Sequence, residues 1–233
     1  MAGVEKSLTD YNEKLLTLFP SLDGKSKEII VANTAFVSVP RGDYIYYEDD
    51  SPMGFICLIE GNAKVVKMGI NGRGHIVRLV RPMALLGYRA LFAEENYRSA
   101  AQALDDSVIA IISKKAFFEV MKSDAAYSLH VLKVIAAELG DSYLRTVALT
   151  QKYLRGRLAD AILELVEIYG FEEDGKTIPV TLSRADLAEL SSMTTSNAIR
   201  TLSAFVSEEV IDGSGKRIRI LDMDRLKKIS ELG

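Results

Sequence analysis

Between Ser191 and Ser207 the chain carries no acidic residue, and the polar side chains there are Ser, Thr and Asn together with a single Arg. Short hydroxyl and amide side chains form hydrogen bonds without a negative charge that would repel phosphates. Asn197 has the amide that pairs with adenine, and Arg200 has the guanidinium that pairs with guanine or with a phosphate. These side chains predict a surface that contacts double-stranded DNA.

Two short helices are expected to position these groups. Ser183 and Asp186 have the spacing of a capping box, so a first helix begins there and ends at the polar pair Ser191 and Ser192. A second helix begins at Thr194, with apolar side chains on one face and polar side chains on the other. The pattern predicts a helix-turn-helix whose second helix is the recognition helix.

A hairpin is expected after the second helix. Residues 212–215, DGSG, have turn chemistry, and residues 216–221 alternate basic and apolar side chains. A helix-turn-helix followed by such a hairpin predicts a winged DNA-binding domain, and a three-helix bundle with a solvated polar face is the alternative. The candidate DNA-binding residues are Ser183, Arg184, Thr194, Thr195, Ser196, Asn197 and Arg200.

Composition limits the class of protein. The 233 residues are 48% hydrophobic and 26% charged, as expected for a folded chain long enough for two domains. No apolar run approaches a membrane span and no signal core begins the chain, so we expect a cytoplasmic protein with no membrane partner. The single cysteine, Cys57, permits no internal disulfide, and we interpret it as a buried core residue.

The charge balance does not by itself favour DNA. The net charge is −3, and residues 151–233 contain 12 basic and 14 acidic side chains. Attraction to phosphates therefore has to come from the local placement of charge, and we expect binding to depend on salt.

Residues 35–113 contain many short segments of strand-like composition, separated by Gly, Pro and Asn turns. Short strands at this spacing predict a jelly roll or β-sandwich with an interior suited to one small ligand. Two short helices are expected before this region, at residues 11–19 and 25–32. The predicted strands are 36–39, 44–47, 55–60, 63–68, 75–80, 98–103 and 108–112.

A long helix is predicted over residues 125–153, which contain no Pro and one glycine, Gly140. Apolar or small residues recur at alternating spacings of three and four, which is typical of a helix pair, so we expect a parallel homodimer. A twofold axis would let two recognition helices read half-sites about one helical turn apart. Packing of the helix on its own β domain, through a second apolar stripe, is an alternative that is compatible with the dimer. The candidate dimer residues are Leu132, Ile135, Leu139, Ser142, Thr146 and Leu149.

The heptad pattern is interrupted by YLRGRL at residues 153–158. We therefore predict an α+β chain of two domains. Residues 1–150 would form a ligand-binding β-roll domain with the dimerisation helix at about residues 125–150, and residues 151–233 would form the winged helix-turn-helix domain.

The order of these parts resembles the bacterial regulators of the cyclic-AMP receptor protein and fumarate-nitrate reduction regulator (CRP/FNR) family, from about Leu15 to Ile220. The most specific matches are LGYRALF at 86–92 with YRSA at 97–100, RGRLA at 155–159, and the helix-turn-helix with its wing. In that family the first motif is the phosphate-binding cassette of a cyclic-nucleotide-binding β-roll, and the ligand lies between it and the long dimerisation helix. The resemblance implies a sequence-specific transcription regulator that binds DNA as a homodimer, with RNA polymerase as a further partner.

The cassette departs from the family at one position. In cyclic-nucleotide binders the glycine that corresponds to Gly87 is followed by a glutamate that holds the ribose hydroxyl, and here Tyr88 stands in its place. Arg98 and Ser99 remain where the family places its phosphate ligands, so one interpretation is an anion site. The other is a structural role in which Arg98 pairs with Glu94 or Glu95. The candidate effector-binding residues are Gly87, Tyr88, Arg98, Ser99, Ser142 and Tyr143, the last two being the long-helix positions that would face a nucleotide base.

Cofactors are constrained by the same comparison. The oxygen-sensing branch of the family uses a cluster of cysteines, so a single cysteine excludes an iron–sulfur cluster. A cyclic nucleotide at the cassette stays open, and so does haem through His75 or His130, the only two histidines. No metal site, Ser-His-Asp set or paired-carboxylate motif is recognisable, so we expect no enzyme.

The recognition helix also departs from the family. Many members begin it with an Arg-Glu or Thr-Glu pair and have a glycine in the turn, whereas Thr195, Ser196 and Ser192 occupy those places here. Arg200 matches the family's second base-reading arginine. The resemblance therefore implies that this helix reads DNA, but it does not imply that the DNA consensus is the same as in other members.

We expect a regulator that a small-molecule signal at the cassette and long helix controls allosterically. The alternatives are a regulator that binds DNA constitutively without an effector, a β-roll protein that only binds a ligand, and a nucleoid-type protein that binds any duplex.

Overall fold

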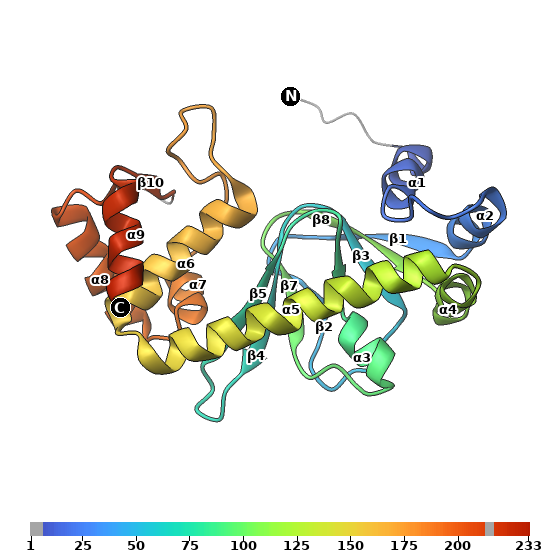
Figure 1. The fold of residues 1–233 in the computed structure, drawn as a ribbon, viewed down its shortest axis with the longest axis horizontal. Helices are drawn as coiled ribbons and strands as arrows, with labels where there is room; N and C mark the ends of the chain where they lie inside the picture. The colour runs from blue at the N-terminus through green and yellow to red at the C-terminus, as the bar shows by residue number, and fades with distance from the viewer. Residues whose placement is uncertain (1–6, 213–216) are drawn as a thin grey trace. The chain divides into compact units, whose positions relative to one another are not determined.

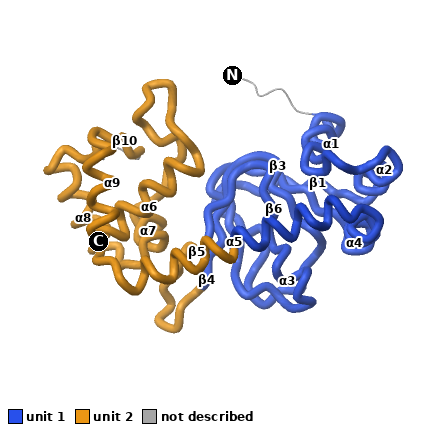
Figure 2. The backbone as a smooth tube through the Cα atoms, in the orientation of Figure 1, with its two compact units in different colours: residues 1–67, 78–138 blue, residues 68–77, 139–233 orange. Residues whose placement is uncertain are grey.

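A computed structural model describes residues 7–212 and 217–233 of the chain (Figure 1). The chain forms two compact units (Figure 2): unit 1 comprises Met1–Lys67 and Arg78–Glu138, and unit 2 comprises Met68–Val77 and Leu139–Gly233. In the part of the chain that the structure describes, none of the helices combines the length and hydropathy that a bilayer-spanning segment needs.

The β-roll consists of two four-stranded sheets, with strand orders β1-β8-β3-β6 and β2-β7-β4-β5, and most of β5 belongs to unit 2. The pairings of β3 with β6 and β8, of β1 with β8, and of β7 with β2 and β4 are antiparallel. The strands are β1 (Thr34–Val39), β2 (Tyr44–Tyr46), β3 (Phe55–Glu60), β4 (Ala63–Met68), β5 (Gly74–Val80), β6 (Ala84–Leu86), β7 (Ala100–Ala103) and β8 (Ser107–Ile112).

Strand β3 is buried on both faces, because alternate residues enter two different cores. Phe55, Cys57 and Ile59 pack with apolar residues of the surrounding helices, such as Phe117, whereas Ile56 and Leu58 pack in the cluster between the sheets. A continuous apolar run, FICLIE, is what a strand covered on both sides requires. Cys57 is fully buried, as predicted, and burial raises the pKa of its thiol.

The expected strands are all present, with ends displaced by a few residues, but two elements between β5 and β7 were not predicted. β6 has only three residues, and the helix α3 (Tyr88–Ala93) has six, so neither is long enough to show a periodicity. Both lie at the predicted cassette. β6 is the edge strand of its sheet and pairs with β3, and α3 follows directly, so the cassette is attached to one edge of that sheet.

Three short helices pack on the core that contains Phe55, Cys57 and Ile59: α1 (Leu8–Leu16), α2 (Gly24–Ala32) and α4 (Lys114–Ser123). Leu15, Ile30 and Phe117 are their fully buried contributions to that core. The long helix α5 (Ala125–Gln151) follows α4, and its residues belong to both units. Its first part packs on unit 1 through Val131, which is buried.

The C-terminal part of unit 2 is formed by α6 (Leu154–Tyr169), α7 (Arg184–Leu190), α8 (Thr195–Ser207) and α9 (Met223–Leu232), with the two-residue strands β9 (Ile211–Asp212) and β10 (Arg219–Ile220). β9 and β10 pair antiparallel, Asp212 with Arg219 and Ile211 with Ile220. Residues 213–215 of the expected turn, and residue 216 at the start of the expected returning strand, lie outside the described residues. The α+β class, the jelly-roll-like β domain, the long helix and the C-terminal helix-turn-helix are confirmed.

Candidate nucleic-acid interface

The first helix of the helix-turn-helix is α7, and a complete capping box begins it. The Ser183 hydroxyl accepts from the Asp186 N–H at 3.0 Å, and the Asp186 carboxylate accepts from the Ser183 N–H at 2.9 Å. Each group satisfies a backbone donor that the helix itself leaves unpaired. The predicted start of α7 is therefore confirmed.

The turn between the helices has two serines with different roles. Ser191 is buried, and its hydroxyl donates to the Leu187 carbonyl. Ser192 has φ of 50°, in the left-handed region where glycine is favoured, which accounts for the glycine that many family members have in this turn. Thr194 then caps α8, its hydroxyl accepting from the Asn197 N–H at 3.2 Å.

Helix α8 has one buried and one exposed face, as the spacing of its apolar residues predicted. Ala198, Leu202 and Phe205 are buried. The exposed side chains are Thr195, Ser196, Ile199, Arg200, Ser203 and Val206 with the terminal Ser207. This face carries no negative charge, so it can approach a phosphate backbone without repulsion.

Two predicted base-reading side chains are bonded to each other. The Arg200 guanidinium donates to the Asn197 side-chain oxygen at 2.9 Å. The amide oxygen of Asn197 is thus oriented by Arg200, and a base contact by either residue involves both. Ile199, which is 48% exposed on the same face, was not predicted as a contact, although its side chain offers the apolar surface that a thymine methyl group needs.

Beside α8 is an open hollow of about 390 Å³. Arg155, at the start of α6, and Arg200 both line it. Two arginines at one hollow suit an anion such as a phosphate. The sequence singled out Arg155 only as part of the RGRLA motif. Arg155 and Arg200 are 45 positions apart, so no local pattern indicated that they line the same hollow. The lining residues are Tyr153, Leu154, Arg155, Arg200, Thr201 and Ala204.

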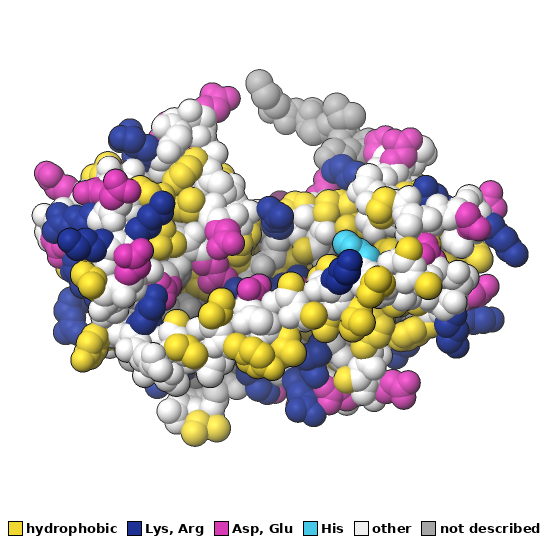
Figure 3. All heavy atoms as spheres, in the orientation of Figure 1, with side chains coloured by type: hydrophobic (Ala, Val, Ile, Leu, Met, Phe, Trp, Pro, Cys, Tyr) yellow, Lys and Arg dark blue, Asp and Glu magenta, His cyan; other side chains and the backbone are white. Residues whose placement is uncertain are grey.

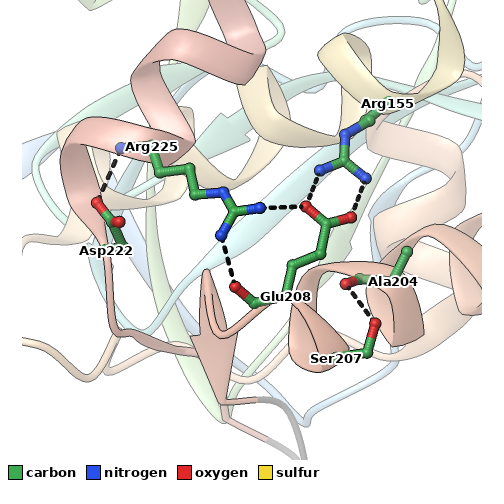
Figure 4. Close-up of polar contacts among 6 residues, drawn as sticks. All are labelled: Arg155, Ala204, Ser207, Glu208, Asp222 and Arg225. Carbon is green, nitrogen blue, oxygen red and sulfur yellow. Dashed lines mark hydrogen bonds and ion pairs between the residues drawn. The ribbon is translucent and has the colours of Figure 1, made fainter.

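The end of α8 is held by an ionic cluster centred on Glu208 (Figure 4). Arg155 bonds to both carboxylate oxygens, and Arg225 bonds to one of them at 2.9 Å. The hydrogen bond from Arg155, with the charges of both arginines, holds the pKa of Glu208 below its ordinary value. The carboxylate is therefore ionised throughout the neutral pH range.

The remaining predicted DNA contacts have partners within the protein. The hydroxyl groups of Ser183 and Thr194 serve as helix caps, so any DNA contact they make comes in addition to that role. Arg184 is half-buried on the first turn of α7.

In unit 1, Gly87 begins the cassette helix α3 with φ of 66°. A Cβ atom at this position would lie 2.6 Å from the Tyr97 ring, so both the backbone conformation and the close approach require glycine. The ring of Tyr97 stacks on that of Tyr46 with centroids 3.9 Å apart. The space next to Gly87 is thus filled by aromatic side chains of the protein.

The predicted phosphate ligand Arg98 pairs with an acid. Its guanidinium donates to the Glu95 carboxylate at 2.6 and 3.0 Å, and its side chain is 74% exposed. Arg89 bonds to the same carboxylate, and the two arginines, Arg89 first, lower the pKa of Glu95. The arrangement matches the structural alternative in which Arg98 pairs with Glu94 or Glu95. Ser99 is half-buried.

Tyr88, which stands where cyclic-nucleotide binders have glutamate, is buried under Arg78. The Arg78 guanidinium lies 5.7 Å from the centre of the Tyr88 ring and 3.5 Å from its hydroxyl, and it donates to the Leu85 carbonyl at 3.1 Å. It also forms an ion pair with Glu138 of α5 at 3.2 Å. One arginine thus links the cassette to the first part of α5 within unit 1.

Helix α5 has a stripe of exposed apolar side chains, and Figure 3 shows hydrophobic side chains along its length. Leu132 and Leu139 are 61% and 52% exposed, and the predicted dimer residues Ser142 and Thr146 are exposed as well. Ile135, also predicted for the dimer, packs instead against the core of unit 1. Leu149 is half-buried.

The other candidate ligand groups belong partly to unit 1 and partly to unit 2. Ser142 and Tyr143 belong to unit 2 and are exposed, Tyr143 by 64%. His130 is exposed on α5, and His75 is half-buried on β5. Within residues 7–212 and 217–233, no group of three or more His, Cys, Asp or Glu side chains is arranged to hold a metal ion.

Two family models match the chain in the regions described above. The cyclic nucleotide-binding domain matches residues 36–124, and the Crp-like helix-turn-helix domain matches residues 156–229. Together they cover the β-roll with α4, and α6 to α9.

Individual relatives agree with this assignment. The chain is 23% identical over 194 residues to the CRP-like cAMP-activated global transcriptional regulator of Mycobacterium tuberculosis, covering 82% of this chain and 86% of the relative. It is 26% identical over 175 residues to the transcriptional regulator SdrP of Thermus thermophilus, covering 75% of this chain and 82% of the relative. The fold is similar to that of FixK2 from Bradyrhizobium japonicum, with a TM-score of 0.75 and 20% identity over 84% of this chain and 96% of FixK2. The chain, which the two family models together match over most of its length, therefore belongs to the CRP/FNR family of DNA-binding transcription regulators, which are not enzymes.

Proposed function

We propose that the chain recognises a specific DNA sequence as a homodimer. The observation that carries this proposal is the exposed, acid-free face of α8, which presents Arg200 with Asn197 beside a hollow that Arg155 also lines. A helix with this composition can enter the major groove, where Arg and Asn discriminate guanine and adenine. Sequence-independent binding would need only contacts with phosphates. The hydrogen-bonded pair of Asn197 and Arg200 instead favours contacts with bases.

The exposed stripe of α5 supports the homodimer. Leu132, Leu139 and Tyr143 are each more than half exposed, and such side chains recur along a helix of 27 residues. An apolar stripe of this length on one helix is suited to pairing with a second copy of itself. A dimer also doubles the number of DNA contacts, which a chain with a net charge of −3 requires for tight binding.

DNA binding could be controlled by a cyclic nucleotide at the cassette or could occur without one. Binding without a cyclic nucleotide has the better support. Tyr88 fills the position of the ribose-binding glutamate, Arg98 is paired with Glu95, and Arg78 joins the cassette to α5 through Glu138. The Arg78–Glu138 ion pair attaches the first part of α5 to the cassette without a ligand. A small-molecule signal of another class could act on the helix by displacing this ion pair.

The other parts of the proposal follow from the family. We assign residues 1–150 to the β-roll with its dimerisation helix and residues 151–233 to DNA binding. RNA polymerase is the expected protein partner, and the cytoplasm, where DNA and polymerase are found, is the expected location.

The test is a selection of random duplex DNA by the purified, ligand-free protein at moderate salt, followed by sequencing of the retained duplexes. We expect a palindromic consensus, the selected site. Enrichment only in the presence of cyclic AMP would overturn the proposal of ligand-free binding. Retention of duplexes without any consensus would overturn sequence-specific recognition and favour a nucleoid-type protein.

A further inference from the structure

An acid at the end of the recognition helix is unexpected on electrostatic grounds. Glu208 is the C-cap of α8. A carboxylate there is repelled by the negative C-terminal end of the helix dipole. Next to DNA it would also repel phosphates. Its presence is explained by the groups that it binds.

Glu208 receives four hydrogen bonds from two other helices (Figure 4). Arg155 of α6 donates to both carboxylate oxygens, one of them at 2.7 Å. Arg225 of α9 donates to the carboxylate and to the Glu208 carbonyl, each at 2.9 Å. The second of these satisfies one of the carbonyl groups that the helix end leaves unpaired. One residue thus attaches the C-terminal end of α8 to α6 and to α9.

The same contacts determine where Arg155 points. Its guanidinium lies over the ring of Phe205, 4.9 Å from the ring centre, and Phe205 is fully buried. The two-oxygen contact with Glu208 holds the plane of that group, while the side chain remains 38% exposed at the hollow that Arg200 also lines. A bidentate pair restricts an arginine far more than a single hydrogen bond does.

The charges of the cluster do not cancel. Two arginines and one glutamate leave one net positive charge beside α8. Without the carboxylate, the Arg155 and Arg225 groups would repel each other and Arg155 would lose its fixed orientation.

We propose that Glu208 is a positioning residue for DNA recognition, which holds the end of α8 against α6 and α9 and orients Arg155 beside Arg200. The proposal rests on the proposed function, because it concerns recognition of the selected site. It predicts that removing the charge of Glu208 lowers the affinity for the selected site, whereas charge repulsion alone predicts a higher affinity.

The test compares Glu208→Gln with Glu209→Gln, a matched control in which the adjacent, exposed acid loses the same charge. We measure the affinity of each variant for the selected site and for an unrelated duplex. Removal of a negative charge should slightly raise the affinity of both variants for the unrelated duplex. Glu208→Gln should nevertheless lose about tenfold in affinity for the selected site, because two charge-assisted bonds to Arg155 are weakened, whereas Glu209→Gln should not.

Thermal unfolding of each variant shows whether it is folded at the assay temperature. If Glu208→Gln is not, Arg155→Lys takes its place, since it keeps the charge but loses the two-oxygen geometry, and the same loss of selectivity is expected. The proposal would be overturned if folded Glu208→Gln discriminated the selected site from the unrelated duplex as well as Glu209→Gln does. If Glu208→Gln is not folded, the same outcome for Arg155→Lys would overturn it. If the unaltered protein has no preference for any site, sequence-specific recognition itself is wrong, so the two failures are distinguishable.

Discussion

At the scale of single residues, Arg200 is the most direct test of the recognition surface. Replacing Arg200 by Ala should cost about 1–3 kcal/mol of affinity for the selected site and relax the base preference at one position. Because Arg200 also orients Asn197 at 2.9 Å, the preference at a neighbouring position should weaken as well. Repeating the selection with the variant measures both effects.

A suitable control for Arg200→Ala is Lys228→Ala, which removes one exposed positive charge from α9. It should lower the affinity for all duplexes alike, without a change of consensus. An unchanged consensus in the Arg200 variant would remove Arg200 from the set of base-reading residues.

At the scale of elements, the loop between α6 and α7 depends on one carboxylate. Asp174 accepts hydrogen bonds from the Thr177 hydroxyl at 2.6 Å and from the Lys176 and Thr177 N–H groups, and these lower its pKa from 3.8 to about 2. The folded protein thus binds the proton less tightly than the unfolded chain does. The contribution of Asp174 to stability is present above pH 3.8 and is lost as the pH falls through about 2.

Asp174→Asn should therefore lower the free energy of unfolding at neutral pH. The difference from the unaltered protein should shrink as the pH falls from 3.8 to about 2. Urea unfolding over a series of pH values measures it. A difference that stays constant down to the lowest pH would mean that the carboxylate makes no contribution that depends on its charge.

The cassette turn at the start of α3 can be tested by adding one methyl group. Gly87→Ala should destabilise unit 1 through the positive φ and through the contact with the Tyr97 ring at 2.6 Å. Gly72 has a similar φ, 69°, but no atoms within 4 Å of an added Cβ, so Gly72→Ala isolates the conformational cost of about 1–2 kcal/mol. We expect Gly87→Ala to cost about 1–3 kcal/mol more in the free energy of unfolding. Equal costs would show that the Tyr97 ring moves aside freely.

At the scale of the whole molecule, dimerisation should depend on exposed residues of α5. Leu132→Gln should weaken the dimer by about 1–2 kcal/mol per subunit, because the leucine is 61% exposed in the single chain and a partner would bury that remaining surface. Lys133→Gln, at the next and also exposed position, is the control. Sedimentation equilibrium measures the monomer–dimer balance, and identical balances for the two variants would contradict the interface assigned to α5.

The response to cyclic AMP is a second property of the whole molecule. A ligand at one hundred times its Kd would add about 2.7 kcal/mol to the free energy of unfolding. Since Tyr88 and the paired Arg98 occupy the cassette positions that hold a nucleotide in the family, we expect cyclic AMP to change neither the unfolding temperature nor the affinity for the selected site. A rise in either would mean that the cassette binds the nucleotide despite these side chains.

Features that depend on neighbours in the chain could be predicted from the sequence. The capping box at Ser183, the Thr194 cap and the apolar face of α8 all arise from residues three or four positions apart, and each is present as expected. The central strand β3 was recognisable from its composition alone. The same spacing rule would also have found the capping box of Ser7 and Asp10, which begins α1 three residues before the predicted helix.

Features that join distant residues were decided only by the tertiary structure. Arg155 and Glu208 are 53 positions apart, and Arg78 meets Glu138 of α5 across 60, so no local pattern indicates that either pair forms. Which acid would bind Arg98 was left open for the same reason, since exposed neighbours compete on equal terms until the fold orients them. Periodicity determined the elements because helix and strand geometry repeat along the chain; the partners of charged side chains were determined by packing, which brings together surfaces that the sequence separates.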